Sequence, residues 1–191
     1  MSDAPAVVSL ERQGRIAVVT LHRAEKRNAV NPEVTAGLDA AFNEIEDDPE
    51  IWVAVLTGGP EVFCAGTDLT GGAGENTERG GEYGLMRRRR TTPLIAAVEG
   101  LAMGGGFELT LASDLVVASR GTVFALPEVA KGVIANARAL FRAVRHLPRN
   151  IAKEMLLTGQ GLSAERAAEL GYVNRLTEPG RRCRSLWSWL S

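Results

Sequence analysis

The feature of this sequence that most constrains its fold is a set of short apolar runs separated by helical patterns. Residues 51–57 form an apolar run that ends at a Gly-Gly-Pro turn. Such a run is typical of a strand in a parallel sheet that is covered on both faces. Residues 94–98 and 115–118 repeat the pattern. Because parallel strands are joined by helical crossovers, the chain is predicted to have an α/β fold.

The segments around these runs predict a hairpin and several helices. Residues 6–11 and 15–22 are rich in β-branched side chains and flank a Gln-Gly pair, which favours a hairpin. Asn31 is a good N-cap, and apolar residues recur after it at helical spacing until residues 47–49. Further helices are predicted over 103–113, 137–145, 148–157 and 163–170, and a last short strand over 172–176.

Two polar segments are predicted to lie on the protein surface. Residues 70–83 contain five glycines and few apolar side chains, which predicts a mobile surface loop. Four arginines at 87–90 are interpreted as the solvated face of a helix. The chain has 22 Lys and Arg against 23 Asp and Glu, and this balance argues against a nucleic-acid partner.

The composition also allows predictions about cellular location and about metal binding. The first ten residues lack the pattern of a secretory signal, and no apolar run reaches membrane-spanning length. We therefore expect a cytoplasmic protein without a membrane partner. Two cysteines and two isolated histidines, His22 and His146, predict no metal site.

Two glycine-containing segments expose main-chain donors. Residues 62–69 read as a strand that enters a turn of small residues and ends at Asp68, which would otherwise cap a helix. Gly104, Gly105 and Gly106 open an apolar helix, although each glycine costs about 1 kcal/mol of helix propensity. A bare helix N-terminus suits a developing oxyanion, while close helix–strand packing explains the glycines equally well.

Two glutamates lie in apolar surroundings. Glu108 follows the glycines by one turn, and Glu128 follows the sequence Phe-Ala-Leu-Pro. Carboxyl groups in such surroundings should have raised pKa values, which suits proton transfer near neutral pH. The structural alternative is that one caps a helix and the other is exposed.

In this order, the motifs resemble the crotonase superfamily, the enoyl-CoA hydratase/isomerase group. The resemblance covers about residues 5–179 and includes the loop 23–29 and the segments 124–128 and 156–159. It implies a ClpP/crotonase-like fold of repeated ββα units with two nearly perpendicular sheets. It also implies an acyl-CoA thioester as substrate, with coenzyme A as part of that substrate and no separate cofactor.

The resemblance carries residue roles onto matching positions. It implies that the amides of Thr67 and Gly105 form an oxyanion hole and that Glu108 and Glu128 handle water and a proton. It implies that coenzyme A is held by two short segments, at Arg23, Lys26, Arg27 and Ala29 and at Ala65, Thr67, Asp68 and Leu69.

Retention of both glutamates favours an enoyl-CoA hydratase of fatty acid metabolism that adds water across the 2,3 double bond. The alternatives are an enoyl-CoA isomerase, a carnitinyl-CoA dehydratase-like lyase, and a protein that binds coenzyme A esters without turnover. The resemblance also implies a homotrimer or hexamer.

The sequence departs from the family pattern at two places. The family pattern has a glycine pair after Glu128, and here Asn136 and Arg138 take its place. This change should alter the floor of the acyl pocket. Composition changes abruptly at residues 181–191, so residues 1–180 are interpreted as the core domain. We expect that tail to replace the family's C-terminal helices through a frameshift or premature stop, with impaired trimerisation and activity.

Overall fold

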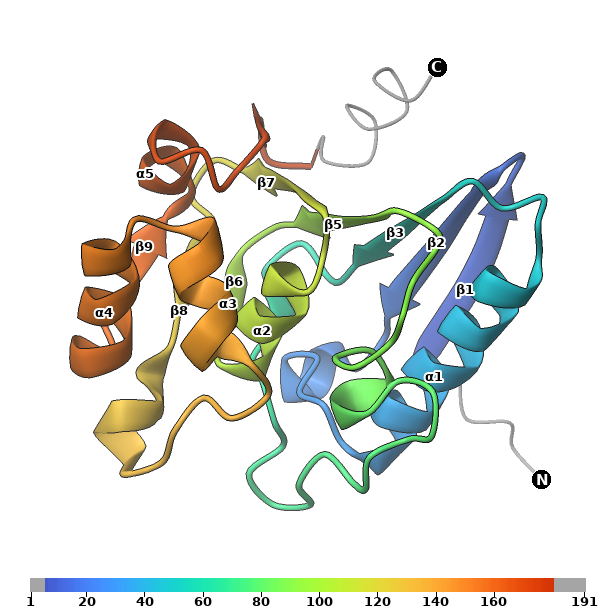
Figure 1. Cartoon of the computed structure of the whole chain (residues 1–191), viewed down its shortest axis with the longest axis horizontal. Helices are drawn as coiled ribbons and strands as arrows, with labels where there is room; N and C mark the ends of the chain where they lie inside the picture. The colour runs from blue at the N-terminus through green and yellow to red at the C-terminus, as the bar shows by residue number, and fades with distance from the viewer. Residues whose placement is uncertain (1–5, 181–191) are drawn as a thin grey trace.

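The computed structural model describes residues 6–180, which form two sheets flanked by helices (Figure 1). The larger sheet has six strands in the order β1 (Val8–Gln13), β2 (Ile16–Leu21), β3 (Val53–Thr57), β5 (Leu94–Val98), β7 (Leu115–Ser119) and β10 (Arg175–Thr177). The smaller sheet has four, in the order β4 (Val62–Cys64), β6 (Leu101–Met103), β8 (Val123–Ala125) and β9 (Leu162–Ser163).

Strand pairing confirms the α/β prediction. β1 and β2 form the predicted antiparallel hairpin, and every other pair in the larger sheet is parallel. In the smaller sheet β4, β6 and β8 are parallel, and β9 pairs with β8 in the opposite direction. The described chain is therefore a mixed α/β fold with two sheets.

The helices occupy distinct parts of the molecule. They are η1 (Ala24–Lys26), α1 (Pro32–Asp47), η2 (Glu82–Gly84), α2 (Gly105–Leu111), η3 (Pro127–Lys131), α3 (Ala139–His146), α4 (Arg149–Thr158) and α5 (Ala164–Glu169). Figure 1 shows α1 beside β1 and β2, α2 in the middle, and α3 and α4 beyond it. Asn31 caps α1 as predicted, because its side-chain oxygen accepts a hydrogen bond from the Val34 amide at 2.9 Å.

The short helix α2 lies in the core, and every one of its residues is buried. The rings of Phe107, Phe124 and Tyr172 pack against one another with centroids 5.4–5.6 Å apart. The hydroxyl of Tyr172 is bonded to the Thr110 hydroxyl at 2.6 Å. This packing fixes α2 and so carries Glu108 into the interior.

The predicted helix over 103–113 starts too early. Leu101–Met103 is strand β6, and α2 begins only at Gly105. The Gly104 amide donates a hydrogen bond to the Ala125 carbonyl. Gly104 has a φ of 53°, which lies outside the right-handed helical region, so this residue forms a turn between β6 and α2. The final strand also lies slightly later than predicted, at Arg175–Thr177.

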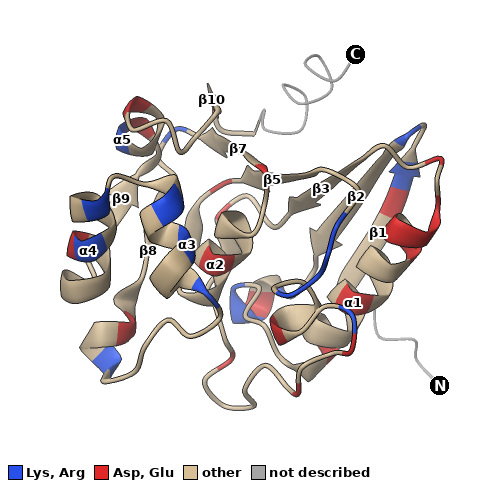
Figure 2. Ribbon diagram, in the orientation of Figure 1, with Lys and Arg blue, Asp and Glu red and all other residues tan. Residues whose placement is uncertain are grey.

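The interpretation of the arginine run as a solvated helix face is wrong. Figure 2 shows these arginines on the connection that leads into β5, which is not helical. The Arg88 side chain is only 2% exposed and pairs with Asp39 of α1. Arg90 donates to the Asp114 carboxylate at 2.7 Å. Three of the four arginines, Arg87, Arg88 and Arg90, therefore form ion pairs within the fold, while Arg89 is exposed.

The prediction of a surface loop over 70–83 is wrong at its end. Tyr83 is buried, in η2, where the chain packs against α1. The predicted tail 181–191 lies outside the described residues. Within the described residues, no helix is both long and apolar enough to cross a membrane.

The buried pair of Arg88 and Asp39 predicts a large loss of stability on truncation. Asp39→Ala leaves the Arg88 guanidinium buried without its carboxylate, so the free energy of unfolding should fall by about 3 kcal/mol in urea titrations. Asp47→Ala is the matched control, since Asp47 pairs with Arg79 through two hydrogen bonds but is 63% exposed. That change should cost less than about 1 kcal/mol. Equal losses in the two variants would contradict this account.

Candidate active site

The site forms where the segment after β4 touches the start of α2. A Cβ built on Gly66 would lie 2.8 Å from the Met103 carbonyl oxygen and 2.9 Å from the Gly105 nitrogen. A Cβ on Gly106 would collide with the Cys64 carbonyl. Small residues are therefore required at Gly66 and Gly106 for the two main chains to come together, and of the three glycines that open α2, Gly106 fits the close-packing interpretation.

This approach leaves two main-chain amides available. Val30 donates to the Gly66 carbonyl and accepts from the Asp68 amide, both at 2.8 Å. Because amides alternate sides along an extended segment, the Thr67 N–H points away from Val30. The Gly105 N–H is in the first turn of α2, where no preceding helical carbonyl exists. Neither amide donates a hydrogen bond to another residue in the part of the chain that is described.

Both amides border a cavity of about 260 Å³. All four predicted catalytic residues line this cavity: Thr67, Gly105, Glu108 and Glu128. Paired amide donors and two carboxyl groups therefore face one small volume.

Glu108 is almost entirely enclosed, with 2% of its surface exposed. Burial raises the pKa of its carboxyl to about 7, and the neighbouring charge of Glu128 adds to this effect. The amide of Ala139, at the start of α3, donates to the Glu108 carboxylate at 2.8 Å and opposes the shift. Glu108 is therefore held in a fixed orientation and titrates near neutral pH.

Glu128 lies on the other wall, in η3, and is partly buried. A Cβ on Gly104 would be 2.9 Å from its Oε1, so the carboxyl lies against the turn that precedes α2. Its Oε2 is buried and has no hydrogen-bond partner among the described residues. Burial raises the pKa of Glu128 above its ordinary value. The two carboxyl groups are thus both favoured in their protonated forms compared with glutamate in water.

A second cavity, of about 240 Å³, adjoins the first and shares Ala65, Thr67 and Leu69 with it. Its walls include Lys26, Arg27, Ala29 and Asp68. Seven of the eight residues predicted to hold coenzyme A therefore meet here. Their role in binding stays a prediction.

Arg23 is the exception among those eight residues. Its guanidinium donates to the Asp68 carboxylate at 2.7 Å and to the Ala29 carbonyl at 3.1 Å. Hydrogen bonds from the Thr70 hydroxyl and amide, followed by the one from Arg23, lower the pKa of Asp68. Arg23 and Asp68 therefore connect the two segments that border this cavity, and the positive charges that line it come from Lys26, Arg27 and Lys131.

A third cavity, of about 480 Å³, extends from the other side of Glu128 and also shares Val133 and Ile134 with the first cavity. Its walls are mainly apolar and come from η3, α3 and α4, including Leu140 and Leu156. The three cavities thus form a series, with basic residues at one end, the carboxyl pair in the middle and apolar side chains at the other end.

Sequence reasoning missed two residues of the central cavity, Tyr83 and Lys131. Tyr83 is the only aromatic residue of the glycine-rich segment 70–83, and that was the available signal. Asn136 lines the central cavity, in agreement with the expected change at its floor. Arg138 adopts a φ of 90°, a conformation that favours glycine, at a position where the family pattern expects one.

The buried Glu108 carboxyl predicts a pH-dependent stability. Because its pKa is higher in the folded chain than the ordinary value of 4.5, its ionisation opposes folding, and stability should fall as pH rises from 4.5 to about 7. Glu108→Gln should remove the part of this decline that Glu108 causes, leaving the part due to Glu128, and should stabilise the chain at pH 8 by at most about 3 kcal/mol. Urea titrations at pH 4.5 and pH 8 measure the effect. Glu154→Gln, an exposed position on α4, is the control and should leave the decline in place.

Comparison with known proteins places these features in a family. The model of the enoyl-CoA hydratase/isomerase family matches residues 11–179. Mevalonyl-coenzyme A hydratase of Aspergillus fumigatus is 40% identical over 85% of this chain, and (E)-benzylidenesuccinyl-CoA hydratase of Thauera aromatica is 40% identical over 90%. The chain spans 63% of the length of the first relative and 70% of the second.

Solved structures agree. A carnitinyl-CoA dehydratase from Mycobacterium avium superposes with a TM-score of 0.92 at 42% identity, covering 98% of this chain and 75% of the other. An enoyl-CoA hydratase from Mycobacterium tuberculosis superposes with a TM-score of 0.92 at 44% identity, covering 97% and 74%. The chain therefore belongs to the enoyl-CoA hydratase/isomerase family and has the crotonase fold.

Proposed function

We propose that this chain is an enoyl-CoA hydratase, which adds water reversibly across the 2,3 double bond of an acyl-CoA thioester. The observation that carries the proposal is the central cavity, where two available amides and two carboxyl groups with raised pKa values meet. The names of the related hydratases and dehydratases support it.

The proposed first step uses the amides. The thioester oxygen accepts hydrogen bonds from the N–H groups of Thr67 and Gly105 as water attacks the β-carbon. Electron density then moves from the double bond through the α-carbon onto that oxygen, which gains enolate character. Fixed donors in an enclosed site stabilise this charge, and loss of one such donor typically costs 10²–10³-fold in rate.

The proposed proton transfers use the carboxyl pair. One ionised glutamate takes a proton from the attacking water, and the other, protonated glutamate gives a proton to the α-carbon. The product therefore gains one hydroxyl and one hydrogen, and the pair ends with the same number of protons. Two adjacent carboxyl groups with raised pKa values retain one shared proton more readily than two solvated groups.

The series of cavities suggests how the substrate lies. Lys26 and Arg27 complement the phosphates of coenzyme A at one end, where main-chain groups of Ala65 and Leu69 border the same cavity. The thioester reaches the amides in the centre, and the acyl chain continues past Glu128 into the apolar cavity.

A carnitinyl-CoA dehydratase-like activity is the second candidate. The polar Asn136 in the cavity wall favours it, since a polar acyl group needs such partners. Product analysis with crotonyl-CoA and carnitinyl-CoA separates the two candidates and would also detect isomerisation. The homotrimer or hexamer implied by the family stays a prediction, and so does the cytoplasmic location expected from the sequence.

The first test is turnover of crotonyl-CoA, whose enoyl absorbance should fall when the protein is added. Glu128→Gln should lower kcat by about 10²–10⁴-fold, because the amide can neither take nor give the proton. Binding of the thioester should persist in calorimetric titrations. Glu154→Gln, an exposed substitution outside the three cavities, is the control for surface charge. Binding without turnover in the unaltered chain would overturn the proposal in favour of a non-catalytic binding protein.

The second test is the pH profile. The active form needs one proton on the carboxyl pair, and Glu108 has a pKa of about 7. We therefore expect kcat/KM for crotonyl-CoA to decline as pH rises above about 7, where the last proton of the pair is lost. A rate that increases steadily from pH 6 to pH 9 would contradict the proposed sharing of one proton.

A further inference from the structure

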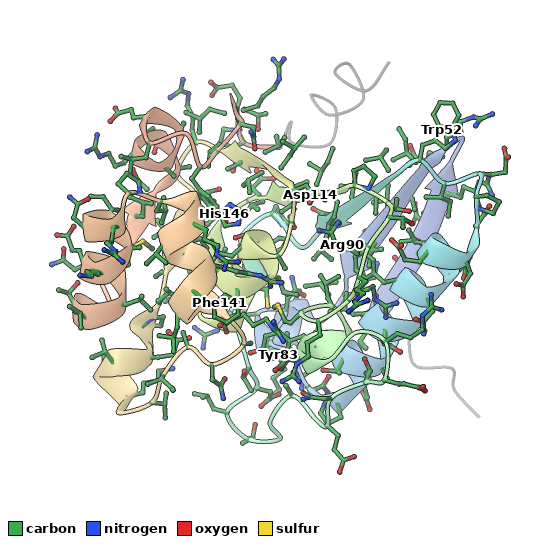
Figure 3. The ribbon with its side chains drawn as sticks, viewed as in Figure 1. Trp52, Tyr83, Arg90, Asp114, Phe141 and His146 are labelled. Atoms are coloured by element: carbon green, nitrogen blue, oxygen red, sulfur yellow. The ribbon has the colours of Figure 1, made fainter. Side chains whose placement is uncertain are left out.

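Tyr83 occupies a position at the amide pair that its sequence context did not indicate. Its hydroxyl lies 2.7 Å from the Thr67 hydroxyl, and a methyl group on Gly105 would collide with it. The residue lines the central cavity and is 5% exposed. Figure 3 labels it on η2, near the centre of the molecule. The phenol therefore stands directly beside both residues whose amides are available.

The hydrogen bond between Tyr83 and Thr67 leaves one hydroxyl proton unused. The two hydroxyl groups carry two protons, and a single hydrogen bond joins them. Neither group forms another hydrogen bond within residues 6–180. One O–H of the pair therefore has no acceptor among the described residues and can donate into the cavity that both residues line.

The backbone at Tyr83 indicates that this placement is costly. Tyr83 has a φ of 55° and a ψ of 16°, a left-handed conformation that is disfavoured for an aromatic residue by about 1–2 kcal/mol. The next residue, Gly84, also has a positive φ and lies so close to α1 that a Cβ there would be 2.6 Å from the Thr35 carbonyl oxygen. Strain of this kind persists where the surrounding structure fixes it, and it often accompanies function.

The phenol also stays protonated. Burial is the main cause that raises the pKa of Tyr83, and the charges of Glu108 and Glu128 raise it further. The hydroxyl is therefore a donor at every pH at which the carboxyl pair can work.

We propose that Tyr83 is a catalytic residue whose hydroxyl donates a third hydrogen bond to the thioester oxygen, beside the amides of Thr67 and Gly105. The Thr67 hydroxyl then donates to the Tyr83 oxygen, so both protons are used when substrate is bound. This inference rests on the proposed function for its effect on rate, but its effect on the bound carbonyl group does not require turnover.

The test compares Tyr83→Phe with Tyr172→Phe. The Tyr172 hydroxyl is bonded to a threonine hydroxyl at 2.6 Å in the same way, but Tyr172 lines none of the three cavities. The probe is butyryl-CoA labelled with ¹³C at the thioester carbonyl, which has no double bond to hydrate. Its infrared carbonyl stretch falls as the oxygen accepts more or stronger hydrogen bonds. The second readout is kcat and KM for crotonyl-CoA.

We expect the stretch of bound butyryl-CoA to be higher in Tyr83→Phe than in the unaltered chain, and unchanged in Tyr172→Phe. We also expect kcat to fall about 10-fold or more in Tyr83→Phe while KM changes little, because two donors remain. An unaltered stretch in Tyr83→Phe would overturn the assignment even if kcat falls. If Tyr83→Phe raises the stretch but the unaltered chain hydrates nothing, the proposed function fails and the Tyr83 contact stands.

A second measurement covers the case in which Tyr83→Phe does not fold. The chain has two tyrosines, so 3-fluorotyrosine incorporated into Tyr172→Phe labels position 83 alone. The more acidic phenol is a stronger donor, and the carbonyl stretch should fall below that of Tyr172→Phe. No change in the stretch would overturn the proposal.

Discussion

The close approach of two main chains, between β4 and α2, is the constraint on which the rest of the site depends. Gly66 and Gly106 allow this contact, because a side chain at either position would meet a main-chain atom of the other segment. The contact places the amides of Thr67 and Gly105 at one cavity. It also sets the direction of α2, whose buried residues carry Glu108 to the same place.

Burial of α2 links the stability of the fold to the chemistry of the site. A helix that exposed one face would leave Glu108 in water with an ordinary pKa. The aromatic rings of Phe107, Phe124 and Tyr172 hold α2 in the interior, so the carboxyl loses its solvent and its pKa rises. The same apolar packing that stabilises the fold therefore produces a group able to exchange protons near neutral pH, at a cost to stability above that pKa.

Local pattern was enough to predict the hairpin, α1 and the buried strands, because hydrophobic periodicity and the Asn31 cap act over a few residues. The candidate residues of the central cavity were also predicted, through ordered motifs that match a family. Features that depend on partners far away in the sequence were not predicted. From the sequence, Arg88 is predicted to be a surface charge, but in the structure it is buried and paired with Asp39 of α1. Tyr83 is predicted to belong to a polar loop, but in the structure it is enclosed by α1 and α2. The hydrophobic periodicity of a segment does not indicate which distant residue will pack against it.

Backbone strain in the described chain gathers around the cavities, and this pattern argues for a preorganised site. Four non-glycine residues have a positive φ, namely Arg27, Asn28, Tyr83 and Arg138. Arg27 lines the second cavity and Tyr83 the first, while Arg138 precedes the amide that holds Glu108. The Asn28 side chain donates to the carbonyls of Val62 and Phe63 and so anchors β4. Since each such conformation costs of order 1 kcal/mol, their coincidence at one site is more readily explained by selection for geometry than by folding alone.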